Sequence, residues 1–365
     1  MYEKLSIEGN VMGKYRKILR INDLKVGMIC AKELMSEGKI LIGKGMPITE
    51  WAINKLKDNY FYNEIEIYCE DNNDIDNNHD KKIETIEQIK RNFDELSGDV
   101  QDFFENLECL HSSSIEEVRK FAVRIQQELK YTNLIIKNIV LYGSGNDAIY
   151  KHSVNVATLS YVLGKWSGLS KTDLNLLTYS AVLHDFGKTK IDKNILDKPG
   201  SLTLKEFDVI KQHPITGYNY IKQIKFLNKS VSFGILMHHE KCDGSGYPLG
   251  LKGDKIHQFG KIIAIADMFD AVNSDRIHKK SKNPLEVLEL IQKESLVKLD
   301  YEYCNIFLSH VINYYIGENV LLNNGLKCKI IQIDINNIGR PLLLNGTSFI
   351  DLKKQQNLYI KRLII

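Results

Sequence analysis

The sequence predicts a mainly α-helical protein with a small α+β unit at its N-terminal end and a small β-rich module at its C-terminal end. Apolar residues recur at helical spacing through the middle of the chain. Short apolar runs separated by polar turns occupy both ends. With 365 residues, 43% of them hydrophobic, the chain can bury cores for two or three domains.

Residues 1–70 are predicted to form the α+β unit, because several short apolar runs flank one helical stretch near 49–57. These runs lie at 28–31, 40–42 and 64–68. Residues 71–80 consist almost entirely of Asp and Asn, a composition typical of a flexible linker.

Residues 81–130 are predicted to be a helical connector. Apolar residues there alternate at spacings of three and four, which is a heptad seam. The seam comprises Ile86, Ile89, Phe93, Leu96, Val100, Phe103, Leu107 and Leu110. Ser114 and Glu117 are expected to cap a second helix that reaches toward Tyr142. The seam favours either a homodimer through the helices of 81–140 or an intramolecular bundle, and both alternatives stay open.

The central region, 131–315, places polar residues on inward-facing helical stripes. His152 shares such a stripe with Val156 and Leu159, in a helix expected over 147–166. Because this stripe is apolar, the imidazole is expected to point into a core.

The next helix carries the adjacent pair His184 and Asp185. Ser170 and Asp173 cap its start, and it is expected to end at Gly187. His184 continues the apolar stripe of this helix, and Asp185 follows it round the helix end.

A third helix is expected to open with the capping pair Thr203 and Glu206. His213 is expected to close it, because Pro214 follows, and Phe207 is expected on its inner face. Ile210 is expected on the same inner face.

A fourth helix, near 230–240, carries His238 and His239, and a later apolar run places Asp267 and Asp270 on one face. A single buried histidine or acid is often a hydrogen-bonded core residue. Several imidazoles and carboxylates on buried faces are instead typical of metal ligands, because burying them unpaired is costly. The sequence therefore predicts a site for two metal ions.

These motifs together resemble the HD-GYP family, bacterial cyclic di-GMP phosphodiesterases within the HD metallohydrolase group. The motifs are His152, the His184-Asp185 pair with Lys188, His213-Pro214, His238-His239-Glu240, Asp243-Gly244-Ser245-Gly246-Tyr247-Pro248, and Asp267 to Arg276. The resemblance covers about 130 to 310 and implies an HD-type, all-helical metallohydrolase domain over 131–315.

The resemblance implies that one ion is held by His152, His184, Asp185 and Asp267, and a second by His213, His238 and His239, with Asp185 bridging. Some members bind a third ion through a glutamate at the position of Ala148, so two ions are expected here. Cys242 stands where the family commonly has an aromatic residue. Mixed imidazole and carboxylate ligation suits iron, manganese and other metals, so the ligands do not fix the metal; iron or manganese is expected.

Two cations about 3.5 to 4 Å apart can share a hydroxide that attacks a phosphodiester. Asp185 and Lys188 are the expected catalytic residues, with Lys188 neutralising a phosphate oxygen. The expected substrate-binding residues are Lys188, Gly246, Tyr247, Pro248, Asp270, Arg276 and Lys279. Alternatively, Lys279 lies on a solvated helix face and does not bind substrate. Without the resemblance to the family, the glycine-rich loop over 243–251 would be interpreted as a tight surface turn.

Charge and composition exclude other classes of partner. The formal net charge of +3 is too balanced to favour a nucleic acid polymer or an anionic membrane. An apolar run long enough to span a membrane does not occur in the sequence. Six cysteines without a C-x-x-C pair, and without a signal peptide, favour a cytoplasmic protein with reduced thiols.

The expected function is hydrolysis of cyclic di-GMP to linear pGpG, or on to GMP. Alternatives are hydrolysis of cyclic GMP-AMP, another HD nucleotide phosphohydrolase, and a non-catalytic cyclic di-GMP receptor. The Gly-Tyr-Pro loop disfavours the general phosphohydrolase, and the complete ligand set disfavours the receptor. Residues 316–365 are expected to form the β-rich module, since Asn324-Gly325 and Asn345-Gly346 are hairpin signals.

Overall fold

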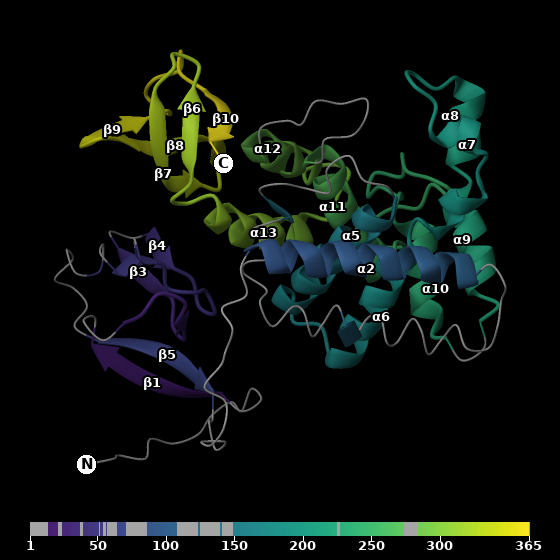
Figure 1. The fold of residues 1–365 in the computed structure, drawn as a ribbon, viewed down its shortest axis with the longest axis horizontal. Helices are drawn as coiled ribbons and strands as arrows, with labels where there is room; N and C mark the ends of the chain where they lie inside the picture. Colours follow the sequence, from purple (N-terminus) through teal and green to yellow (C-terminus); the bar gives the residue numbers. More distant parts are fainter. Residues whose placement is uncertain are drawn as a thin grey trace. The chain divides into compact units, whose positions relative to one another are not determined.

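A computed structural model describes most of the chain in two compact units, Met1–Ile83 and Glu84–Ile365 (Figure 1). The described residues are 14–20, 24–36, 39–50, 52–53, 56, 64–70, 86–107, 123–124, 139–140, 149–224, 227–273 and 284–364. Among them, no helix combines the length and the apolar character that crossing a bilayer requires.

The first unit contains a small antiparallel sheet in the order β1-β5-β2, with a separate hairpin β3-β4. The strands are β1 (Lys14–Arg20), β2 (Ile29–Cys30), β3 (Leu34–Ser36), β4 (Lys39–Ile42) and β5 (Glu64–Glu70). Alternation along β5 buries Ile65 and Ile67 and leaves Glu66 partly exposed. Ile48 and Leu56 complete the core of this unit.

The second unit is built on a layered bundle of helices (Figure 1). Its elements are α2 (Ile86–Leu107), α5 (Ile149–Trp166), α6 (Lys171–Leu183), η3 (Phe186–Lys190), α7 (Lys193–Leu196), α8 (Leu204–Ile210), α9 (His213–Ile221), α10 (Lys229–Met237), α11 (Gln258–Asn273), α12 (Pro284–Glu294), α13 (Tyr301–Val311) and η4 (Ile312–Tyr314). Helix α5 packs against α2, α6 and α11, and α10 packs against α6, α9 and α11. This packing brings the helices that carry histidine and aspartate to a common centre.

Helix α2 packs its heptad seam onto α5 of the same chain. Leu96, Val100, Phe103 and Leu107 of the seam are buried in the common core. The intramolecular alternative accounts for these side chains, while the homodimer stays a prediction. Most of the helix expected after Ser114 lies outside the described residues.

Two predicted helix boundaries are wrong. Helix α6 begins after the predicted cap Ser170 but ends at Leu183, and a 3₁₀ helix rather than a last α-turn leads past Gly187. His213 opens α9 instead of closing α8, with Pro214 in the first turn. Proline fits there because the first turn of a helix leaves its N–H groups without intrahelical partners.

The predicted capping box of α8, Thr203 with Glu206, is confirmed. The predicted inner face is wrong: α8 has no buried residue, and Phe207 is 43% exposed. Ile210 is only partly buried. Helix α10 is also shorter than expected, because it ends at Met237 and His238 is its C-cap.

The chain ends in a five-stranded antiparallel sheet in the order β10-β6-β7-β8-β9. The strands are β6 (Asn319–Leu322), β7 (Lys327–Asp334), β8 (Asn337–Asn345), β9 (Ser348–Asp351) and β10 (Ile360–Ile364). Gly325 and Gly346 lie at the two predicted hairpin turns with positive φ. Val320, Ile330 and Leu343 belong to the same core as the helices, so sheet and helices form one compact unit.

Candidate metal centre

The structure brings five histidines and two aspartates from the predicted set to one place. His152 comes from the first turn of α5, and Asp267 from α11. The remaining five lie at helix ends or in the turns that follow them: His184, Asp185, His213, His238 and His239. The predicted ligand set is therefore assembled in space.

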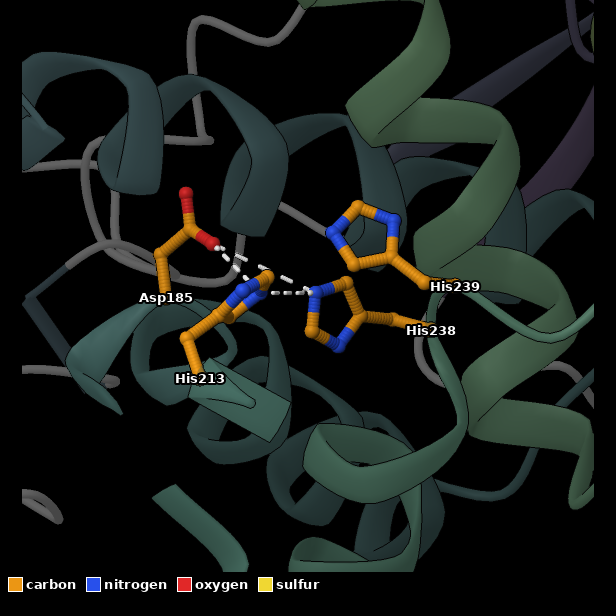
Figure 2. A group of neighbouring side chains, drawn as sticks. All are labelled: Asp185, His213, His238 and His239. Carbon is orange, nitrogen blue, oxygen red and sulfur yellow. Dashed lines mark hydrogen bonds and ion pairs between the residues drawn. The ribbon is translucent and has the colours of Figure 1, made fainter. Parts of the chain in front are cut away.

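Asp185 connects the two parts of this cluster, and Figure 2 shows its carboxylate directed toward His213 and His238. Its Oδ1 lies 3.3 Å from Nε2 of His213 and 4.0 Å from Nε2 of His238. Its Oδ2 lies 3.4 Å from Nε2 of His184 and 3.7 Å from Nε2 of His152. The two oxygens of one carboxylate thus face two different sets of imidazoles.

Potential ligand atoms form two compact groups that share Asp185. One group is Asp185, His213, His238 and His239, and the other is His152, His184 and Asp185. Asp267 belongs to neither group, although its Oδ1 lies 3.0 Å from Nε2 of His152 and 4.0 Å from Nε2 of His184. Its Oδ2 lies 3.9 Å from Nδ1 of His239, so this carboxylate borders both sets.

Three of the histidines are oriented by main-chain carbonyls at helix ends. Nδ1 of His184 contacts the carbonyl oxygen of Ala181, and Nδ1 of His213 that of Ile210, each at 2.7 Å. Nδ1 of His238 contacts the carbonyl oxygen of Ile235 at 2.6 Å. The last carbonyls of an α-helix have no intrahelical partner, so they are available as acceptors. A proton on Nδ1 leaves Nε2 of each ring as the metal-binding nitrogen.

His152 is oriented by a side chain instead. Its Nδ1 lies 2.7 Å from Oδ2 of Asp270, whose Oδ1 accepts a 2.8 Å hydrogen bond from Asn155. Asp270 is fully buried behind the imidazole. We had expected Asp270 to contact substrate, and its burial instead favours a role in orienting His152.

A close backbone approach joins the two histidine sets. A Cβ at Gly187 would collide with the carbonyl of His213, so only glycine lets η3 lie against the start of α9. This contact brings Asp185 to His213. The sequence showed Gly187 beside the His-Asp pair but gave no sign of the segment against which it packs.

The cluster fits a cationic group. Nε2 of His184 and Oδ1 of Asp185 are buried and have no hydrogen-bond partner among the described residues. Burying such atoms without a partner is costly, and divalent cations held by the two groups would satisfy them. Imidazole nitrogens with carboxylate oxygens are the donor set of several transition metals.

The electrostatics of the two sets differ. Burial lowers the pKa of His213 to about 3 and the pKa of His239 to about 4. Burial also acts to lower the pKa of His152, but hydrogen bonds to Asp267 and Asp270 outweigh it and raise the pKa to about 9. Burial acts to raise the pKa of Asp185, yet His184 and Lys188 hold it well below its ordinary value. Asp185 is therefore ionised and able to ligate metal.

Lys188 is the described cation nearest to the cluster. The 3₁₀ helix η3 carries it, and its Nζ donates a 2.7 Å hydrogen bond to Oδ2 of Asp185. Its side chain is 17% exposed, so the ammonium group is reachable from solvent. The other predicted cations, Arg276 and Lys279, lie outside the described residues, as does Ala148.

The predicted Gly-Tyr-Pro loop lies beside the second set of histidines. The ring of Tyr247 lies 4.7 Å from that of His239, centroid to centroid, and 6.5 Å from that of His213. Burial raises the pKa of Tyr247, so the hydroxyl stays protonated. Gly246 and Pro248 flank this tyrosine within the loop, and both are partly buried.

Two buried polar residues near the cluster received no role from the sequence: Asn155 on α5, and Glu240, which follows the histidine doublet. A signal existed for Asn155, since it lies three residues after His152 and therefore on the same side of the helix. Glu240 belongs to the motif His238-His239-Glu240, so the sequence marked this residue without indicating its role.

Residues 139–303 match the family described as HD domain. The helical fold and the His-Asp pair agree with this match, so the central part of the chain is similar to an HD domain.

The chain is also similar to curated cyclic dinucleotide phosphodiesterases. A cyclic di-GMP phosphodiesterase of Pseudomonas aeruginosa is 30% identical over 215 residues, 59% of this chain and 50% of that protein. A 3'3'-cGAMP-specific phosphodiesterase of Vibrio cholerae is 33% identical over 190 residues, 52% of this chain and 43% of that protein. The chain thus spans about half the length of the curated relatives it matches. The predicted resemblance is confirmed at the level of sequence.

A solved structure supports the fold. The HDG"Y"P protein of Bdellovibrio bacteriovorus aligns with a TM-score of 0.52 at 19% identity, covering 81% of this chain and 99% of that one. At this identity the likeness concerns the fold alone.

Proposed function

We propose that this chain is a metal-dependent phosphodiesterase that hydrolyses cyclic di-GMP. The single observation that carries the proposal is the position of Asp185, whose two oxygens face two separate sets of imidazoles. A carboxylate in this position can bridge two ions. Relatives named as cyclic di-GMP phosphodiesterases support the choice of substrate.

Two ions, with iron or manganese as the proposed metal, would be held by the residues of the cluster. His152, His184, Asp185 and Asp267 would hold the first, and His213, His238, His239 and Asp185 the second. When bound, such a pair of ions acidifies water and neutralises the negative charge of a phosphodiester. The protein holds the Nε2 atoms of His184, His213 and His238 in place through the helix-end carbonyls.

Lys188 is proposed to bind a phosphate oxygen of the substrate. Its ammonium already lies at the edge of the cluster, 2.7 Å from Asp185. A compact charge at this position stabilises the additional negative charge that develops as the phosphodiester is attacked. Tyr247, together with Gly246 and Pro248, is proposed to line the same side of the site.

Arg276 and Lys279 are proposed to bind the remainder of the dinucleotide, on the strength of the family motif alone. Asp270 is proposed to orient His152 instead of binding substrate, because it is fully buried and bonded to that imidazole.

Cyclic GMP-AMP is the second candidate substrate. A relative named as specific for 3'3'-cGAMP is 33% identical to this chain, and relatives named for cyclic di-GMP are 30% to 40% identical, so identity alone does not separate the two substrates. The two nucleotides differ in one purine base and share the phosphodiester bonds, so a cluster that acts on a phosphodiester does not by itself distinguish them. Direct assay distinguishes them.

The test is anaerobic purification with metal analysis, followed by assay against both cyclic dinucleotides. We expect two ions per chain and release of a linear dinucleotide from cyclic di-GMP. A stoichiometry near three would contradict the expectation drawn from Ala148. Binding of cyclic di-GMP without any hydrolysis by the metal-loaded protein would favour a receptor.

A further inference from the structure

The loop of residues 243–251 is fastened to the residue that follows the histidine doublet. Glu240 is 3% exposed, and its Oε1 accepts a 2.6 Å hydrogen bond from the backbone N–H of Leu249. Its Oε2 accepts a 2.8 Å hydrogen bond from the N–H of Leu251. Hydrogen bonds to a buried carboxylate are stronger than those between neutral groups. One side chain thus closes the loop onto its own start.

The middle of the loop, at Gly246 and Tyr247, lies directly on the segment that carries the histidines. The N–H of Tyr247 donates a 3.1 Å hydrogen bond to the carbonyl of His239. A Cβ at Gly246 would collide with the backbone of Glu240 and Lys241, so glycine is required for this approach. The ring of Tyr247 is thereby set against the imidazole of His239, at 4.7 Å between centroids and 31° between planes.

His239 is held differently from the other four histidines. Those four each have Nδ1 within 2.7 Å of an oxygen acceptor. Among the described residues, His239 makes no such hydrogen bond, and its nearest carboxylate is Asp267 at 3.9 Å. No dashed line joins its ring to the other three residues of Figure 2. The ring of His239 instead packs against three rings, those of His238 at 4.1 Å, His213 at 5.0 Å and Tyr247 at 4.7 Å between centroids. Tyr247 is the one of these three that is not itself a proposed metal ligand.

We propose that Glu240 is a positioning residue for the second metal ion. Its carboxylate fixes the loop, the loop fixes Tyr247, and the ring of Tyr247 holds His239 in the orientation that ligation needs. This assignment rests on the proposed function, since it concerns the same ligand set, and it adds a route by which a residue without contact to the ion controls its affinity.

The experiment is titration of the metal-free protein with Mn²⁺, without substrate. Glu240→Gln keeps the size of the side chain but loses the charge and one acceptor, so a loop N–H faces an NH₂ group. We expect one of the two Mn²⁺ ions to bind about 10- to 100-fold more weakly, the usual effect of losing an outer partner of a ligand. The other ion should bind as in the parent. Unchanged affinity for both ions overturns the proposal.

Tyr247 supplies the second arm of the test. Tyr247→Ala removes the ring and should weaken the same ion, whereas Tyr247→Phe keeps the ring and should bind Mn²⁺ as the parent does. If Tyr247→Ala retains parental affinity, the ring does not position His239. This arm decides the question even if Glu240→Gln fails to fold.

A double variant separates positioning from general destabilisation. If Glu240 acts through Tyr247, Glu240→Gln combined with Tyr247→Ala binds Mn²⁺ no more weakly than Tyr247→Ala alone. Additive losses would show that Glu240 acts by another route and would overturn the proposal.

Asp351→Asn is the matched control, because Asp351 also accepts a backbone hydrogen bond in a turn, from Lys353 at 3.0 Å, far along the chain in the sheet. It should leave both affinities unchanged. Loss of Mn²⁺ affinity in this control as well would show a general effect of stability and overturn the assignment. The titration does not depend on turnover, so a protein that shows this Mn²⁺ pattern but hydrolyses no cyclic dinucleotide refutes the proposed function alone.

Discussion

His152 and the helix-end histidines reach the same cluster by different means. His184, His213 and His238 each point Nδ1 at the carbonyl three residues earlier, where a helix is ending. His152 lies in the first turn of α5, where the main-chain carbonyls already bond to N–H groups further along the helix. Its Nδ1 therefore needs a side-chain acceptor, which Asp270 supplies from α11.

The comparison shows that a metal ligand can be oriented by local or by long-range structure. The helix-end histidines are oriented by backbone within three residues, so no single side-chain substitution removes their acceptor. His152 depends on a carboxylate 118 positions away in the chain. We call the set of His152, His184, Asp185 and Asp267, proposed to hold the first ion, the His152 half of the centre. We expect its affinity for metal to be the more easily weakened by mutation.

The largest effect is expected from Asp185→Ala, which removes the carboxylate shared by both halves. Turnover of cyclic di-GMP should fall by more than about 100-fold, beyond the usual effect of losing an outer partner of a ligand. Activity assay with metal analysis and circular dichroism measures this. A folded variant that keeps both ions and near-parental turnover would contradict the bridging position.

Asp270→Asn should affect only the His152 half. The substituted amide can still accept a hydrogen bond from His152, but it lacks the charge that strengthens the bond. One ion should bind about 10- to 100-fold more weakly in a Mn²⁺ titration, with the other unchanged. Equal weakening of both ions would mean that Asp270 supports the whole cluster.

The two halves should also differ in their dependence on pH. The pKa of His152 is raised to about 9, so at pH 7 its imidazole is protonated and must release a proton to bind metal. His213 and His239, with pKa values of about 3 and 4, are already neutral at that pH. Between pH 6 and 8, affinity for the first ion should rise about tenfold per pH unit, and affinity for the second should stay flat.

Calorimetric titration in two buffers of different ionisation enthalpy measures the protons released. The expected result is about one proton for the first ion and about none for the second. Equal proton release on binding of the two ions would contradict the predicted difference in pKa between His152 and the histidines of the second set.

The smallest effect on metal binding is expected from Ile235→Val. Ile235 provides the carbonyl that orients His238, and its side chain is fully buried. The substitution should lower the free energy of unfolding by about 0.5 to 1.5 kcal/mol and leave Mn²⁺ affinity unchanged, because the acceptor is backbone. Chemical denaturation measures the free energy of unfolding, and a Mn²⁺ titration measures the affinity. Weakened binding with little loss of stability would show that the carbonyl position depends on the side chain.

The predicted helices around the centre were mostly confirmed where capping chemistry marked them. Ser170 and the pair Thr203 and Glu206 lie where the sequence placed them, since a cap depends on residues three positions apart. The ends were less predictable. Pro214 was expected to stop a helix and instead opens one, because proline is compatible with both positions.

The sequence by itself singled out the seven side chains that the structure brings together, because their motifs are distinctive. It also indicated hairpin turns near Gly325 and Gly346, where local backbone chemistry is decisive. Only the tertiary structure decided that Asp270 lies behind His152, that Gly187 abuts His213, and that Glu240 fastens the loop carrying Tyr247. These contacts join residues through the packing of separate segments, and periodicity along one helix carries no information about which segment will lie opposite.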